Sequence, residues 1–186
     1  AELEAAVVPA DAAPLALEEL ARFLVYTGAD DPAEHRARQI INRAVDAQAT
    51  VERLRLAASL AENRADVMRL FARAKALAPN DPEVALFEAG LRHSSLHPSD
   101  ALGVLDRFTG TGTFALRALD LRAAVYATLE MPESAYATMQ TLVARAPDAY
   151  VYTNALARNA LALGRADEAM ALRHRTIAIK WDEAPS

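Results

Sequence analysis

A 34-residue period runs through this sequence and restricts its possible folds more than any other feature. The last full period, residues 147–180, contains two amphipathic segments, 149–163 and 166–179, separated by a turn at Gly164 and Arg165. Shifting that window back in steps of 34 places a small apolar residue at the same point each time: Ala169, Ala135, Ala101, Val67 and Ala33. Repeats of this length bury their apolar faces against their neighbours, so the period predicts an array of helix pairs.

Other predicted inward positions follow the same period. The first helix of each pair contributes Ala21, Arg55, Ala89, Ala123 and Ala157. The second helix adds two more columns, which are Ala37, Phe71, Leu105, Met139 and Arg173, and Ile40, Ala74, Phe108, Leu142 and Thr176. Three positions, Arg55, Arg173 and Thr176, are not apolar. The rest predict one continuous apolar seam along the array.

Turn signals divide the array in phase with this pattern. We expect repeats at 14–47, 48–81, 82–114, 115–147 and 148–180, within one domain of residues 14–180. Asp31-Pro32 and Asp81-Pro82 each combine an N-cap with a first-turn proline, and Gly28 is suited to a left-handed helix end. Residues 1–13 read as the tail of a preceding repeat or a linker, and 181–186 as a C-terminal tail. Trp181 is expected to cover the last helix or to contact a further repeat.

Composition limits the classes of function. With 53% hydrophobic and 24% charged residues, the chain is not intrinsically disordered. A net charge of −5 argues against a nucleic-acid partner, because phosphates require a concentrated basic surface. No apolar run approaches the roughly 20 residues of a membrane-spanning helix. The absence of cysteine excludes disulfides and thiolate catalysis. The compartment stays open between the cytoplasm and the periplasm or export.

Two further patterns suggest chemistry but fit structural roles better. His93 and His97 are spaced as one-face metal ligands, yet the H-E-x-x-H pattern is missing and Pro98 ends the helix, so we expect a turn-facing pair without metal. The run TGTGT at 109–113 lacks the lysine of a phosphate-binding loop. It predicts an early end to the preceding helix and a longer, more mobile connection.

Several repeats carry the pattern of a known family. Leu156, Ala157, Ala160, Gly164 and Ala169 form one unit of it, Ala135, Met139 and Pro147 belong to a second, and Val67, Phe71, Ala74 and Pro79 belong to a third. In these positions the chain resembles the tetratricopeptide repeat, although no repeat has that family's tryptophan. The resemblance implies an all-α, right-handed solenoid of about five helix-turn-helix repeats. Its concave groove, lined by the first helix of each pair, would bind a protein or peptide segment.

The groove-facing polar residues implied by this resemblance have mixed charge. They are Glu18, Arg22, Tyr26, Glu52, Glu83, His93, Arg117, Asp120, Asn154 and Arg158. Of these, Asn154 and Arg158 resemble part of a carboxylate-binding set found in one variant of the family, whereas Glu18 and Asp120 would repel an acid. Arg22 and Arg158 could hold carboxylates in bidentate fashion. The competing interpretation is a solvated surface with weak intrahelical ion pairs.

We therefore expect a non-catalytic scaffold for a protein or peptide, without cofactor or metal. The G-x-S-x-G context of a serine nucleophile is absent, and no two carboxylates are forced together in an apolar setting. The alternative is a repeat segment of a larger multidomain protein, such as an exported bacterial enzyme. There it would act as a spacer and docking element.

Overall fold

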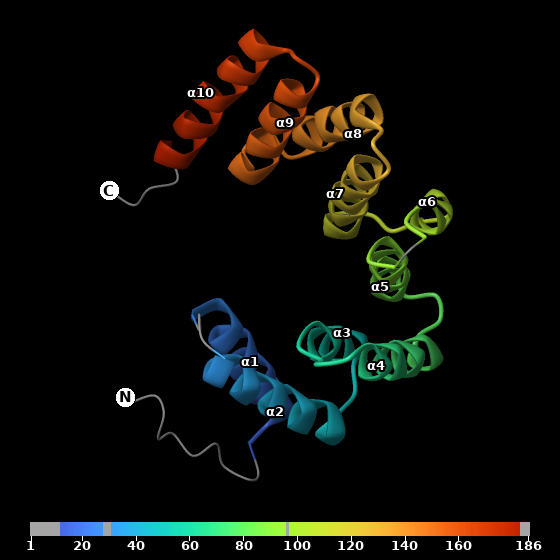
Figure 1. Cartoon of the computed structure of the whole chain (residues 1–186). Helices are drawn as coiled ribbons and strands as arrows, with labels where there is room; N and C mark the ends of the chain where they lie inside the picture. Colours follow the sequence, from blue (N-terminus) through green and yellow to red (C-terminus); the bar gives the residue numbers. More distant parts are fainter. Residues whose placement is uncertain (1–11, 28–30, 96, 183–186) are drawn as a thin grey trace. The chain divides into compact units, whose positions relative to one another are not determined.

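The computed structural model describes residues 12–27, 31–95 and 97–182, and over these residues the chain is all-α (Figure 1). Ten helices follow one another in antiparallel pairs, and no described residue is in a strand. The all-α fold of helix-turn-helix repeats predicted by the 34-residue period is confirmed. The chain divides into two compact units at Val84 and Ala85, and each is described on its own.

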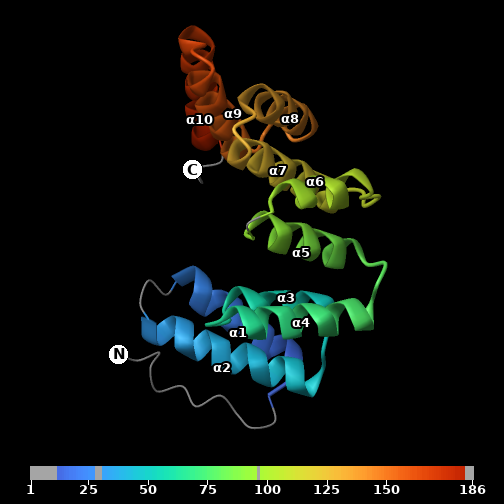
Figure 2. The ribbon, with the colours of Figure 1, turned by 45° about the vertical axis from the view of Figure 1, so that its right-hand side comes forward.

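The first unit contains two helix pairs. Helix α1 (Pro14–Thr27) packs against α2 (Asp31–Ala47), and α3 (Val51–Ser59) packs against α4 (Arg64–Leu77). Helix α2 also contacts α3, so that the two pairs stack (Figure 2). Its buried apolar side chains include Leu17, Ala21, Ala37, Ile40, Ile41, Ala44, Leu54, Leu70 and Ala74.

Local sequence sets the starts of these helices. The side chain of Thr50 caps α3 by accepting the Arg53 amide at 3.2 Å, and Asn63 caps α4 by accepting the Asp66 amide at 2.9 Å. Helix α5 (Pro82–His93) crosses the division between the units and begins at a proline after Asp81. The carboxylate of Asp81 accepts the Glu83 amide at 2.7 Å, which is the N-cap expected from the Asp-Pro pair.

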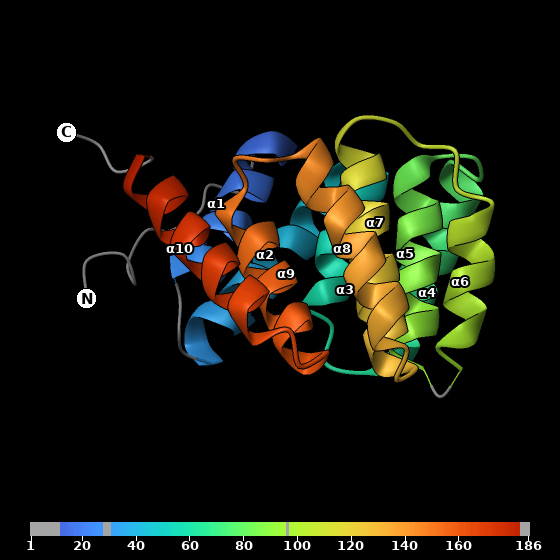
Figure 3. The same cartoon turned by 90° about the horizontal axis from the view of Figure 1, so that it is seen from above.

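The second unit continues from α5 with five more helices. They are α6 (Ser99–Asp106), α7 (Thr113–Thr128), α8 (Pro132–Arg145), α9 (Tyr150–Ala162) and α10 (Ala166–Asp182). Helices α6 to α9 each pack against the next helix in the chain, and Figure 3 shows α8, α9 and α10 in succession. One cluster of buried side chains joins α5, α6 and α7, and a second joins α7, α8, α9 and α10. The apolar seam therefore runs through consecutive pairs within this unit.

The 34-residue period is visible in the hydrogen bonds of the turns. The amide of Met131 donates to the Tyr126 carbonyl at 2.9 Å, and 34 residues later the amide of Arg165 donates to the Ala160 carbonyl at 2.9 Å. These bonds close α7 and α9 with the same left-handed turn, at Glu130 with φ 55° and at Gly164 with φ 73°. The same hydrogen bond and a similar positive φ at this spacing show that the period is structural.

The inward positions are mostly those predicted. Ala21, Ala89, Ala123 and Ala157 are each at most 3% exposed, which allows close helix packing. Two of the predicted inward positions that are not apolar in the sequence are also not buried in the structure, because Arg173 is exposed and Thr176 is half-buried.

Some boundaries differ from expectation. Helix α6 ends at Asp106, as the TGTGT run suggested, but α7 already begins at Thr113. Helix α10 continues to Asp182 and includes Trp181 in its backbone, because nothing in the sequence before Pro185 breaks the helix. The Trp181 side chain, Gly28 and residues 1–11 lie outside what the structure describes.

Candidate functional site

The ten predicted groove residues lie on the first helices of the pairs. Glu18, Arg22 and Tyr26 are on α1, Glu52 is on α3, Glu83 and His93 are on α5, Arg117 and Asp120 are on α7, and Asn154 and Arg158 are on α9. Their environments differ strongly, and these differences separate the residues that stabilise the fold from those that remain available to a ligand.

Glu18 is a buried structural residue. It is 6% exposed, and its carboxylate accepts hydrogen bonds from Arg53 Nε at 2.9 Å and from Arg22 Nη2 at 2.8 Å. Burial alone would raise the pKa of Glu18, but the hydrogen bonds and positive charges of Arg22 and Arg53 hold it below its usual value. Glu18 and Arg22 are thus paired with each other within the first unit, where Glu18 is buried and the Arg22 side chain is 39% exposed.

Glu83 is also buried, at 2% exposure, and forms an ion pair with Arg55. This pair explains why an arginine replaces the small residue expected at position 55. The arginine reaches from α3 to the carboxylate at the start of α5, where a small side chain would leave Glu83 without this counter-charge. Sequence reasoning noticed Arg55 as an anomaly but did not connect it with Glu83.

Three other predicted residues have simpler environments. Tyr26 is 91% exposed, and Glu52 is also exposed. His93 ends α5, and its Nε2 lies 2.8 Å from Oγ1 of Thr128 at the end of α7. His97 lies beyond the end of α5, so the two histidines do not share a helix face.

In the second unit, Asp120 and Arg158 meet at one cavity. It has a volume of about 360 Å³ and lies among α7, α8 and α9. Besides these two residues, its wall is formed by Ala123, Ala124, Ala127, Met139, Ala155 and Asn159. Asp120 and Arg158 come from the first helices of consecutive pairs. Of the ten predicted residues, these are the two that the structure brings together in a described cavity.

The charges of this cavity are not satisfied within the chain. Over the described residues, neither Asp120 nor Arg158 makes a hydrogen bond or ion pair with another side chain. The Asp120 side chain is exposed, but the surrounding cavity wall desolvates it in part, and this raises the pKa of Asp120 above its usual value because no nearby donor compensates. The cavity therefore presents one carboxylate and one guanidinium beside a wall of alanine and methionine.

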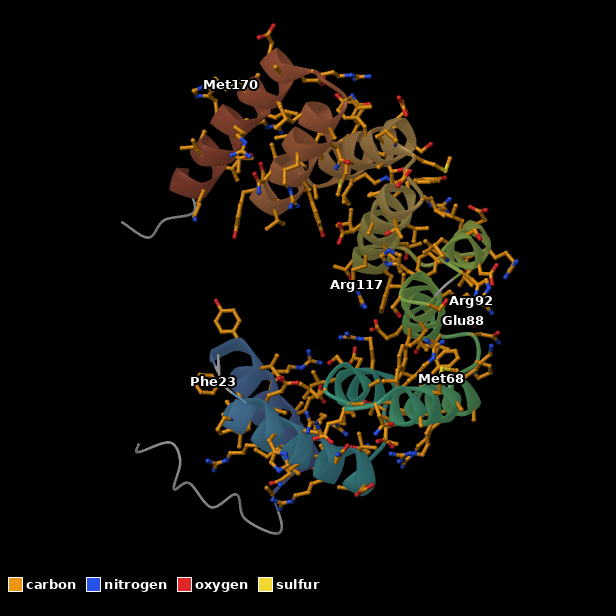
Figure 4. All side chains as sticks on the ribbon, viewed as in Figure 1. Phe23, Met68, Glu88, Arg92, Arg117 and Met170 are labelled. Carbon is orange, nitrogen blue, oxygen red and sulfur yellow. The ribbon has the colours of Figure 1, made fainter. Side chains whose placement is uncertain are left out.

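The other two predicted residues near this region lie outside the cavity wall. Arg117, one turn before Asp120 on α7, has its guanidinium 5.7 Å from the Phe114 ring centre (Figure 4). Asn154 is half-buried on α9. Asn159, which does line the cavity, was missed by sequence reasoning. Its amide donates to the Ala155 carbonyl at 2.9 Å, and its position next to Arg158 was the available signal.

A smaller cavity of about 140 Å³ lies in the first unit and is lined by α2, α3, α4 and the turn between α3 and α4. Its charged groups are already paired: Arg38 contacts Glu62 and the Leu60 carbonyl, and Arg69 contacts Asp66 at 3.1 Å.

In the described part of the chain, no three histidine or acidic side chains are grouped as metal ligands would be. None of the described helices combines the length and apolar character needed to cross a membrane.

Comparison with known proteins gives structural neighbours only. No protein-family model matches the sequence, and no curated protein is a significant match. Among solved structures, MamA residues 41 to the end from Desulfovibrio magneticus RS-1 is 16% identical, with a TM-score of 0.59 over 92% of this chain and 97% of that one. Yeast Tom70 is 19% identical, with a TM-score of 0.66 over 90% of this chain and 36% of that one. Likeness at these identities shows the fold.

Proposed function

We propose that this chain, which has the fold of tetratricopeptide-type helical repeat proteins, is a non-catalytic scaffold that binds a protein or peptide segment. The binding surface proposed is the cavity formed by α7, α8 and α9 in the second unit. The structural neighbours MamA and Tom70 are repeat proteins of the same type, which supports a protein partner.

The observation that carries this proposal is the contrast between Asp120 and two other acids assigned to the groove, Glu18 and Glu83. Glu18 and Glu83 are buried in ion pairs that hold the helices together. Asp120 instead lines a cavity without a partner among the described residues, and Arg158 lies in the same wall. Charged groups left unpaired beside apolar side chains suit recognition, because a ligand can supply both the counter-charges and the apolar contacts.

The cavity chemistry favours binding over catalysis. Asp120 and Arg158 are the ionisable members of its described wall, and the remainder is alanine, methionine and one asparagine. A lone carboxylate with an arginine lacks the nucleophile and oriented base that define most hydrolytic sites. The alternative of a spacer segment within a larger enzyme is favoured by no feature of the described residues and stays a prediction.

Affinity capture with matched variants tests this proposal. Three baits would be used on lysate from cells that express the protein: the parent, Asp120→Lys/Arg158→Glu, and the control Asp148→Lys/Arg173→Glu. The control residues are exposed and lie outside the cavity, and both double variants keep the net charge of the parent. We expect partners that the parent and control capture and the cavity variant loses. Equal capture by all three baits, or capture by none, would contradict binding at this cavity.

A further inference from the structure

We infer that the α7–α9 cavity recognises a mixed-charge peptide segment, in which a lysine or arginine side chain of the partner docks on Asp120 and an acidic side chain docks on Arg158. This inference rests on the proposed function and specifies its ligand.

Asp120 lines the cavity and differs from three acidic residues of the second unit that have partners within the chain. Glu88 pairs with Arg92 at 2.6 Å on α5 (Figure 4), and Asp106 pairs with Arg122 at 2.6 Å. Glu168 accepts a hydrogen bond from the Tyr136 hydroxyl and lies 3.7 Å from Arg165. Asp120 carries a comparable charge with no such partner over the described residues. A cation from outside the chain would supply the interaction that the fold provides to Glu88, Asp106 and Glu168.

The wall beside Asp120 suits a long basic side chain rather than a bare ion. Ala123, Ala127 and Met139 line the cavity and present methyl groups and a flexible thioether. The methylene stem of lysine or arginine packs on such a surface while its charged end reaches a carboxylate. A metal ion would need further oxygen ligands. No group of three acidic or histidine side chains is available among the described residues.

The positive charge of Arg158 restricts how the charged groups of a ligand can be placed in the cavity. Its guanidinium belongs to α9, one helix pair after Asp120 on α7, and lines the same cavity. A ligand with basic residues alone would bring a second cation against it, at an electrostatic cost. A carboxylate placed there instead forms a charge-assisted, often bidentate contact. The wall therefore favours a segment in which basic and acidic side chains are close in sequence.

A peptide selection measures this preference directly. A random peptide library would be selected on the immobilised full chain, and the enriched peptides synthesised and titrated against the parent, Asp120→Asn, Arg158→Gln and the control Asp148→Asn. We expect enriched peptides to contain a basic and an acidic residue near each other. Asp120→Asn and Arg158→Gln should each weaken binding about tenfold or more, as loss of a charge-assisted contact does, while the control binds like the parent.

Exchanging the charges of the peptide residue and of Asp120 distinguishes a direct contact between them from an indirect effect of the substitution. Replacing the basic residue of the peptide by glutamate should abolish binding to the parent, and Asp120→Lys should restore it. Enriched peptides without basic residues, or with affinity unchanged by Asp120→Asn, would overturn the charge assignment while leaving peptide binding intact. No enrichment by a correctly folded parent would overturn both this inference and the proposed function. Circular dichroism melting would establish that each variant is folded.

Discussion

Arg53 Nε of α3 donates to Glu18 Oε2 of α1 at 2.9 Å, and the two side chains are only 7% and 8% exposed. The residues are 35 positions apart and join the first helices of consecutive pairs. Arg53 also donates to the Gln48 carbonyl at 2.9 Å, before the start of α3. A buried, hydrogen-bonded charge pair thus takes the place that an apolar contact would occupy.

Removing one partner of this pair should destabilise the fold strongly. Arg53→Ala leaves Glu18 buried with Arg22 as its remaining partner, and the expected loss in unfolding free energy is about 3 kcal/mol. Arg69→Ala, which breaks the exposed Arg69–Asp66 pair, should cost less than about 1 kcal/mol. Urea denaturation of both variants gives the comparison. Equal losses would show that the Glu18–Arg53 pair contributes no more than a surface contact.

Stability should also depend on the ionisation of Glu18. Because the pKa of Glu18 is lowered in the folded state, its contribution is fully present above the unfolded value of about 4.3 and is lost as the pH falls through the folded pKa. The difference in unfolding free energy between the parent and Glu18→Gln should therefore shrink below about pH 4. Urea titrations from pH 7 to pH 3 measure it. A difference that stays constant over this range would contradict the assignment.

Asp120→Asn should make the protein more stable at neutral pH. Partial desolvation raises the pKa of Asp120, so its ionised form slightly destabilises the folded state above that pKa, and the effect is small because the side chain is exposed. The gain in Tm over the parent should decrease as the pH is lowered toward about 3.9, where the unfolded aspartate also takes up a proton. The exposed Asp148→Asn serves as control. A Tm lower than that of the parent would indicate an unrecognised favourable partner.

Thr153 offers a test of an unsatisfied buried hydroxyl. Its side chain is fully buried in α9, and Oγ1 has no hydrogen-bond partner within the described part of the chain. Thr153→Val keeps the shape and removes the polar atom, so we expect a gain of about 1 kcal/mol in unfolding free energy. Thr138→Val should give no such gain, because the Thr138 hydroxyl donates to the Ser134 carbonyl. Thermal unfolding of the two variants distinguishes them.

Substituting a larger residue for the small residue that recurs every 34 positions tests how closely the helices pack there. Ala169 of α10 is 5% exposed and belongs to a cluster with Tyr136 and Leu142. Ala169→Leu should overpack this contact and cost about 1–3 kcal/mol. The exposed Ala171→Leu should change stability little. An unchanged Tm for Ala169→Leu would mean that the helices are not held as closely as the seam implies.

The fold could be predicted from the sequence because its main constraint is periodic. Each helix pair repeats the same apolar positions, and columns such as Ala123 and Ala157 can be aligned without knowing any long-range contact. Turn chemistry reinforced the alignment at Asp81 and Pro82. Regular, local information of this kind is what a single sequence carries best.

The use of the charged residues could be predicted only in part. A glutamate on a first helix has the same sequence appearance whether it faces solvent or is buried against an arginine, as Glu18 is against Arg53. The pairing depends on how neighbouring repeats stack, which the period does not specify. Arg55 was the one usable signal, because an arginine at a packing position requires an acid nearby. The selection of Asp120 and Arg158 from the ten candidates required the structure.

The left-handed turn at Glu130 and Gly164 has the same form in two repeats, so the turn residues of one repeat could replace those of the other. Its backbone geometry and its hydrogen bond recur 34 residues apart although one residue is glycine and the other is glutamate. The glutamate holds a conformation that costs a side-chain-bearing residue about 1 kcal/mol, so the geometry is imposed by the helices on either side. A three-residue cassette, Leu163–Gly164–Arg165, could then be grafted over residues 129–131. An array assembled from such grafts would keep the turns between its helices while the residues of its binding surface are varied.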